Sequence, residues 1–386
     1  MDALILARWE FAVTAGVHFL MVATTLGLGP VVAALQTAVW RAGRAPARGS
    51  APVLEAARDR ILRLYLLNYG IGIVTGLVME LQMAVNWTGA GSALYDPIAA
   101  LLGVETLAAF FVESTLLGLF LASGGTFSQG VRTLLLWGVA GTAWLSAWVV
   151  VSANAYLHRP TGVSMVDGRA SFTDPWAVLT QAAAVVASIH IVGAAGLVAA
   201  FWVAAAGAAL VLRQGADDPV GRLLLRVGIW IGAVTAPVNV ASGVVQFSAA
   251  RADAKFTNYG WHGGLLALML LIGALILLIT WLLWVPLLLR GRVFRTRFAL
   301  RILGGGVWIP LLACILGWIS REEARQPWFI VGRVRVADAV SAPEGPALAL
   351  TAFGFIAVGV CAAVLAWVLM GREIRRPLRQ GTEVVS

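Results

Sequence analysis

Ionisable side chains interrupt several long apolar stretches of this sequence. On membrane-insertion scales such a group costs about 2.5–3.5 kcal/mol near the centre of a spanning helix, so each one is a candidate for function. Histidine ligates haem iron, and buried carboxylates can carry protons. The residues in or beside these stretches are His18, Glu80, Glu105, Glu113, His190, His262 and Glu322.

Three of these residues lie at a similar distance from an arginine at the far end of their stretch. His18 and His190 each precede that arginine (Arg41 or Arg213) by 23 residues, and Glu322 follows its own by 21. In helices this places all three about 30–35 Å from the basic edge. A shared tier near one membrane face suits axial ligands of haems stacked there. The alternative for a single histidine is a hydrogen-bonded packing residue.

The composition predicts a polytopic membrane protein. Of the 386 residues, 60% are hydrophobic and 12% are charged, about half the charge of a soluble domain. These values exclude a soluble enzyme and a disordered chain, and the scattered arginines argue against nucleic-acid binding. Nine stretches reach the length of about 20 residues that a spanning helix needs. They cover residues 11–40, 61–85, 99–122, 132–152, 177–212, 223–247, 262–289, 300–319 and 346–371.

Arginine placement predicts the orientation of these helices. The basic residues of the whole chain are arginines except for one lysine, Lys255. With the N-terminus outside and the C-terminus in the cytoplasm, the cytoplasmic segments hold 19 of the 28 basic residues. This bias follows the positive-inside rule. The arginine-rich segment 290–301 is then a cytoplasmic loop that faces anionic lipid. The two cysteines, Cys314 and Cys361, lie in apolar runs and indicate neither a disulfide framework nor a zinc site.

Six segments carry specific motifs, the most specific being VETLAAFFVESTLLGLF with Glu105 and Glu113. The six are RWEFAVTAGVHFLMVATTLGLG (8–29), GIVTGLVMELQMAVNW (72–87), VETLAAFFVESTLLGLF (104–120), TAWLSAWVVVSANAYLHRPTG (142–162), SIHIVGA (188–194) and GWISREEARQPW (317–328). In this order, over nearly the whole chain, they resemble subunit I of cytochrome bd-type oxygen reductases, whose nine helices begin outside.

The resemblance implies roles for residues at matching positions. His190 would ligate a low-spin haem b, and His18 and Glu322 would serve two closely spaced high-spin haems, with Glu105 beside them or ligating. Glu113 would pass protons from the cytoplasm, with Glu80 and Asn154 as further candidates. Arg325 would neutralise haem propionates or Glu322, a residue that by itself resembles part of a solvated charge cluster.

The resemblance also implies an activity and its partners. The expected reaction is the reduction of O2 to water in a prokaryotic cytoplasmic membrane, with three haems: low-spin b, high-spin b, and haem d or a further haem b. The expected partners are a second membrane subunit, small accessory subunits, and a quinol or cytochrome c-type donor. The ligands do not distinguish haem d from haem b.

The second ligand of the low-spin haem is less clearly marked. The family has a methionine near the start of the seventh span, where this sequence reads NYGWHGGLLALMLLIGAL (258–275). An ungapped match places Gly264 there, whereas a shifted match places Met269. Met269 lies 21 residues from Arg290 and His262 lies 28, whereas the other expected ligand, His190, lies 23 residues from Arg213. Two ligands of one haem should have similar depth, so we favour Met269, with His262 as the rival.

The outer loop between the sixth and seventh spans is shortened. The family carries a long loop there, with a lysine and a glutamate implicated in quinol oxidation, whereas this chain has only residues 248–261, with Lys255 and no glutamate. The electron donor is therefore open. Two alternatives to an oxidase follow: a bd-derived haem electron-transfer subunit that does not reduce O2, and a non-redox membrane transporter or structural partner. Transport sites usually lie near the midplane of the membrane, whereas the candidate residues of this chain lie near one face, which argues against a transporter.

Overall fold

Long helices account for most of the chain. The computed structural model describes residues 3–44, 50–87, 92–166, 169–252, 261–340 and 346–377. Within these residues nine helices are long and apolar enough to cross a membrane, which confirms the predicted fold class of an all-α polytopic protein. Several are longer than the apolar windows in the sequence, because the helices continue through the membrane interface into polar residues.

Three of the nine helices are interrupted. The continuous ones are α1 (Ala3–Ala42), α2 (Ala51–Asn86), α5 (Gln129–His158), α7 (Ala182–Gln214), α8 (Pro219–Ala252) and α14 (Pro346–Arg375). The third consists of α3 (Ser92–Thr106), the π-helical η3 (Leu107–Glu113) and α4 (Ser114–Ala122). The seventh consists of α9 (Trp261–Ile279), the π-helical η4 (Thr280–Trp284) and α10 (Val285–Leu289). The eighth consists of α11 (Arg297–Gly305) and α12 (Trp308–Glu323).

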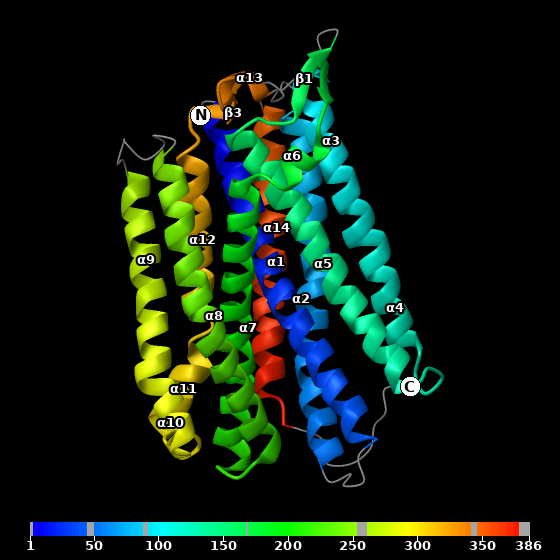
Figure 1. The fold of residues 1–386 in the computed structure, drawn as a ribbon, viewed down its shortest axis with the longest axis vertical. Helices are drawn as coiled ribbons and strands as arrows, with labels where there is room; N and C mark the ends of the chain where they lie inside the picture. The colour runs from blue at the N-terminus through cyan, green and yellow to red at the C-terminus, as the bar shows by residue number, and fades with distance from the viewer. Residues whose placement is uncertain are drawn as a thin grey trace.

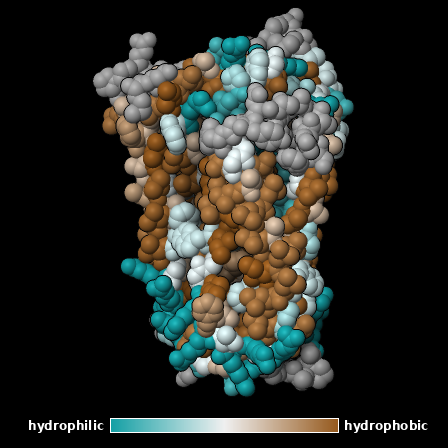
Figure 2. Space-filling model, turned by 90° about the vertical axis from the view of Figure 1, so that its left-hand side faces the viewer, coloured by the Kyte–Doolittle hydropathy of each residue, from teal (hydrophilic) through white to brown (hydrophobic). Residues whose placement is uncertain are grey.

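The helices alternate in direction between two ends of the molecule (Figure 1). The end that carries Ala3, at the top of Figure 1, is called the N-terminal end. The opposite end, where α1, α7 and α14 finish, is called the basic end because Arg41, Arg213 and Arg375 lie in their last turns. Figure 2 shows an apolar band between hydrophilic side chains at the two ends, as a membrane-spanning body requires.

Small residues bring the central helices close together. A Cβ on Gly27 of α1 would lie 2.1 Å from the carbonyl oxygen of Ala195 in α7. A Cβ on Gly207 of α7 would lie 2.6 Å from the backbone nitrogen of Leu225 in α8. Close backbone approach through small residues is how membrane helices pack. It fixes α1, α7 and α8 relative to one another.

Short elements cover the N-terminal end. They include the hairpins β1 (Val163–Val166)–β2 (Arg169–Phe172) and β3 (Trp328–Ile330)–β4 (Val334–Arg335), with α6 (Pro175–Leu179) and α13 (Val336–Ala339). A 3-10 turn, η5 (Arg292–Phe294), lies at the basic end. Of the predicted outer loop 248–261, residues up to Ala252 continue α8 and Trp261 begins α9, while 253–260 lie outside the described residues.

Candidate functional site

The ring of His18 is held by α2. Its Nδ1 lies 3.1 Å from the hydroxyl oxygen of Thr75, which donates its own proton to the carbonyl of Gly72. The hydroxyl therefore accepts, and Nδ1 carries the ring proton. A Cβ on Gly76 would be 3.0 Å from Cε1 of the ring, so α2 lies directly against it. This arrangement leaves the Nε2 lone pair to ligate a metal, as a hydrogen bond at Nδ1 does in metal sites.

The ring of His190 is held in the same way by α8. Its Nδ1 lies 3.0 Å from the carbonyl oxygen of Asn239 and 3.3 Å from the hydroxyl of Ser242. A carbonyl can only accept, so Nδ1 again carries the proton and Nε2 the lone pair. The Asn239 side chain donates to the carbonyl of His190 at 3.0 Å, and Gly243 lies against the ring. Two separate helix pairs thus orient a histidine in the form that binds metal.

Glu322, at the end of α12, is almost buried and fully paired. Arg325 donates to Oε2 at 2.5 Å, and the Asn154 amide donates to Oε1 at 2.9 Å. Arg321 in turn donates to the side-chain oxygen of Asn154, Oδ1, at 2.8 Å. Arg325 is also buried and donates to the carbonyl of Phe329. The structure therefore brings Glu322, Arg325 and Asn154 together, and Glu322 does not belong to a solvated charge cluster.

The third spanning segment carries both glutamates of its motif: Glu105 lies in α3, two residues before the π-helical η3, and Glu113 is the last residue of η3. Ser146 of α5 donates to Glu105 at 3.0 Å, and Tyr65 of α2 donates to the buried Glu113 at 2.9 Å. A π-helix bonds at i+5 instead of i+4, so η3 takes up about one extra residue. The i, i+7 spacing that shares one face of an α-helix therefore becomes i, i+8. This is the spacing of Glu105 and Glu113.

The remaining candidates are less enclosed. Glu80 is exposed and accepts a hydrogen bond from Thr106. Met269 packs on α12, where its sulfur faces Gly317. Met269 lies eight residues beyond the start of α9, and His190 lies eight residues beyond the start of α7. The backbone of His262 belongs to α9, but its side chain lies outside the described residues.

A buried polar cluster between α1 and α2 was not predicted. Glu10 is fully buried and accepts from Asn86 at 2.6 Å, while Thr14 donates to Gln82 at 2.6 Å. Further buried atoms here have no hydrogen-bond partner among the described residues, including Glu10 Oε1, Gln82 Nε2 and the Trp87 indole nitrogen. The sequence signal was Glu10 itself, one residue before the apolar stretch that begins at 11.

The donor set fits haem better than a bare metal ion. No three His, Cys, Asp or Glu side chains gather around a common point in the described part of the chain. His18 and His190 lie on different helices, each with its own orienting partner. A macrocycle supplies four of the iron ligands itself and needs only one or two axial ligands from the protein. Singly placed histidines meet that need.

Comparison with known proteins gives consistent matches over nearly the whole chain. The family model for cytochrome bd terminal oxidase subunit I matches residues 6–256 and 264–378. Cytochrome bd ubiquinol oxidase subunit 1 of Bacillus subtilis is 24% identical, covering 99% of this chain and 95% of that protein. Cytochrome bd-II ubiquinol oxidase subunit 1 of Escherichia coli is 35% identical over 161 residues, which is 42% of this chain and 30% of that protein.

The fold also matches a solved structure. A chain of the bd oxidase from Geobacillus thermodenitrificans superposes with a TM-score of 0.84 at 18% identity, covering 97% of this chain and 98% of that one. At this identity the likeness concerns the fold, and it extends to all nine spanning helices because the coverage is almost complete.

Proposed function

The chain belongs to the cytochrome bd terminal oxidase subunit I family, and from this premise we propose that it reduces O2 to water at haems held near its N-terminal end. It is a multi-pass membrane subunit of a terminal oxidase, and the family implies haem cofactors. In the proposed orientation the N-terminal end faces outward and the basic end faces the cytoplasm of a prokaryotic cell, in agreement with the positive-inside rule.

The single observation that carries this proposal is the matched orientation of two histidines. In both His18 and His190 a neighbouring helix accepts the Nδ1 proton, so Nε2 is available as an axial ligand. We assign His190 and Met269 to a low-spin haem b, with His262 as the rival to Met269. His18 and Glu322 are assigned to two high-spin haems, one of type b and one of type d or b, with Glu105 beside them. When bound, the haems carry electrons, and one with an open position binds O2.

Arg325 and Asn154 position the carboxylate of Glu322. Their hydrogen bonds to its two oxygens fix it at the top of α12, where an axial ligand would be needed. The guanidinium of Arg325 is buried, and a buried cation favours an anion nearby. Arg325 therefore balances Glu322 and the haem propionates together.

Glu113 and Glu105 are proposed to hand protons from the cytoplasmic side towards the haems. Glu113 Oε1 accepts from Tyr65, and the neighbouring Tyr69 hydroxyl is 2.9 Å from that of Ser114. These hydroxyls lie in or next to the turn where η3 meets α4. Glu105 lies about 12 Å closer to the N-terminal end. A proton held on Glu113 thus has an acceptor on the same helix face, with Ser146 bonded to that acceptor.

We propose a quinol as the electron donor and a second membrane subunit as partner, with small accessory subunits as further candidates. The two relatives described above carry ubiquinol oxidase in their names, and a putative subunit I from Bacillus subtilis, 25% identical over 63% of this chain, is named for menaquinol. A cytochrome c-type donor is the competing expectation, because the outer loop is short.

A reduced-minus-oxidised absorption spectrum of the purified complex, repeated with CO, tests the proposal. Haem bands with a CO-sensitive component, together with O2 uptake on quinol, are expected. A haem spectrum that CO does not change would indicate an electron-transfer subunit instead. A complex without haem would overturn the proposal and favour a non-redox membrane protein. If cytochrome c supports O2 uptake and quinol does not, the proposed electron donor is wrong and the rest of the proposal stands.

Paired variants test the assigned ligands. His18→Ala and Glu322→Ala are expected to abolish O2 uptake and alter the high-spin bands. Glu323→Gln is the matched control, because it changes the neighbouring carboxylate, which pairs with Arg8 at 3.4 Å. If His18→Ala and Glu322→Ala keep full uptake, these ligand assignments are wrong.

A further inference from the structure

Arg60 closes the C-terminal end of the last helix. It lies on α2, is fully buried, and donates through Nη1 to the carbonyl of Glu373 and through Nη2 to that of Arg376 at 2.7 Å. The Glu373 carboxylate lies 3.6 Å from Arg60 and accepts from Arg63 Nε at 2.7 Å. The one carboxylate that the described residues place at this junction is thus already engaged by two arginines of α2.

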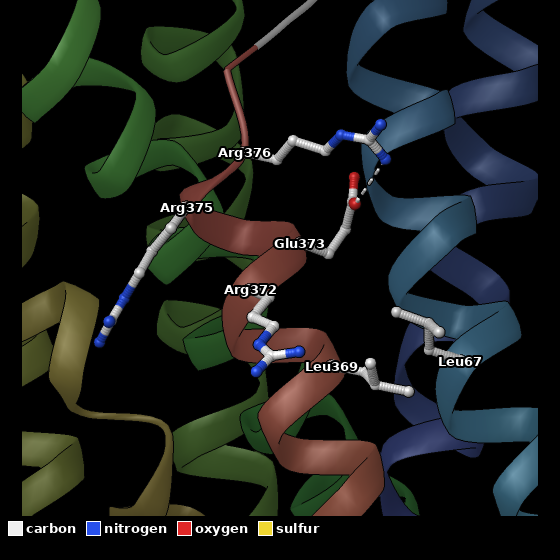
Figure 3. Close-up of a pocket in the computed structure, with 6 residues that line it drawn as sticks. All are labelled: Leu67, Leu369, Arg372, Glu373, Arg375 and Arg376. Atoms are coloured by element: carbon white, nitrogen blue, oxygen red, sulfur yellow. Dashed lines mark ion pairs between the residues drawn. The ribbon is translucent and has the colours of Figure 1, made fainter.

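A cavity of about 470 Å³ opens beside this junction, between α2 and α14. Its lining consists of Leu67, Leu369, Arg372, Glu373, Arg375 and Arg376. Figure 3 shows Arg376 extending from the end of α14 towards α2, with Leu67 and Leu369 between the two helices. Arg372 lies in front of α14, and Arg375 extends away from α2. The two leucines are nearer the middle of the helices, and Arg376 lies beyond the last turn of α14.

Positive charge at the cavity exceeds what the described residues neutralise. Three arginines (60, 63 and 376) lie within 4 Å of the Glu373 carboxylate, and Arg372 and Arg375 line the same cavity, so these six side chains carry a formal charge of +4. Within the described residues, Arg372 and Arg375 have no acidic side chain at ion-pair distance. Arg376 approaches Glu373 only at 3.8 Å. The cavity therefore presents guanidinium groups to an anion from outside the chain.

We propose that this cavity binds the phosphate group of an anionic phospholipid, with its acyl chains against Leu67 and Leu369. The lining has an apolar part and a basic part, as such a lipid has acyl chains and a charged headgroup. The leucines lie towards the membrane interior and the arginines lie at its boundary. Basic pockets between spanning helices on the cytoplasmic side are suited to such headgroups, and guanidinium groups bind phosphate oxygens well. A soluble phosphate would share the chemistry of the arginines but would gain nothing from the leucines.

Lipid binding to the purified, delipidated complex tests this site. Native mass spectrometry during titration with phosphatidylglycerol, and separately with phosphatidylcholine, should show preferential retention of phosphatidylglycerol. Arg372→Gln/Arg376→Gln should weaken that retention about 10- to 30-fold, because each surface arginine contributes roughly a fivefold factor. Arg213→Gln/Arg301→Gln removes the same charge from two exposed arginines of the chain and should leave retention unchanged.

The outcomes separate the lipid from other anions. Equal retention by Arg372→Gln/Arg376→Gln, or no preference of the unaltered complex for phosphatidylglycerol, would overturn the proposal. Displacement of the lipid by millimolar inorganic phosphate would assign the site to a soluble anion instead. Loss of the second subunit from this variant, without a lipid preference in the unaltered complex, would assign it to a subunit contact. If the double variant does not fold, Arg372→Gln alone, which leaves the Glu373 ion pairs intact, replaces it.

Discussion

The sulfur of Met269 lies against Gly317, where α9 crosses α12. A Cβ placed on Gly317 would be 2.5 Å from that sulfur, so an alanine there would have to displace the methionine side chain. The contact fixes the position of a flexible side chain on a helix that is otherwise largely exposed. Because Met269 is proposed as a haem ligand, the glycine of the GWISREEARQPW segment gains a positioning role.

Gly317→Ala is expected to displace the Met269 sulfur while leaving the fold intact, because a methionine side chain can move at little cost. The low-spin band in the reduced-minus-oxidised spectrum should shift or weaken, and Met269→Leu should remove it. Gly304→Ala is the matched control, since no described atom lies within 4 Å of its Cβ position. A low-spin band that survives Met269→Leu and disappears in His262→Leu would assign the ligand to His262.

Glu113→Gln is expected to lower O2 uptake by about 100-fold, the lower range for loss of a positioned proton-transfer group. The haem spectrum should not change. Tyr65→Phe removes one hydrogen bond to the carboxylate and should lower uptake only about 2- to 10-fold. Glu55→Gln, an exposed carboxylate on α2, serves as control. Oxygen-electrode rates that are equal in Glu113→Gln and Glu55→Gln would remove Glu113 from the proton path.

Thr75→Val is expected to loosen the haem at His18. The substitution keeps the size of the side chain but removes the acceptor of the Nδ1 proton, and losing such a partner costs about 10- to 100-fold in metal affinity. Haem retained per protein after dilution is the measurement. Thr24→Val, on α1, removes a buried hydroxyl that bonds only to the helix backbone at Leu20. Equal haem retention in the two variants would contradict the role of Thr75.

Arg60→Met is expected to destabilise the protein by about 3 kcal/mol, because it leaves a buried carboxylate and two helix-end carbonyls short of a partner. Thermal unfolding of the detergent-solubilised complex should show a Tm several degrees lower. Arg63→Met alters a half-exposed partner of the same carboxylate, with 42% of its side chain accessible, and should change Tm little. A larger loss in Arg63→Met than in Arg60→Met would show that the buried contacts are not the stabilising ones.

The spanning helices could be predicted because each must be apolar over its whole length, a property of the local sequence. Glu10 and Arg60 were missed because charge ends an apolar window, and the predicted spans therefore begin one residue later, at 11 and 61. Their partners, Asn86 and the end of α14, are 76 and more than 300 residues away along the chain. No pattern in the local sequence predicts contacts between residues so far apart in the chain. The π-helical turn before Glu113 is likewise a product of packing.

The pairing of Arg60 with the end of α14 also bears on the order of biogenesis. During synthesis, α2 enters the bilayer long before α14 is translated. Until then the guanidinium has neither the carbonyls nor the carboxylate that surround it in the finished protein. The nascent chain therefore keeps one charged anchor at the membrane boundary until the last helix arrives. Completion of that helix seals the bundle, so a truncated product that lacks α14 would remain open beside α2.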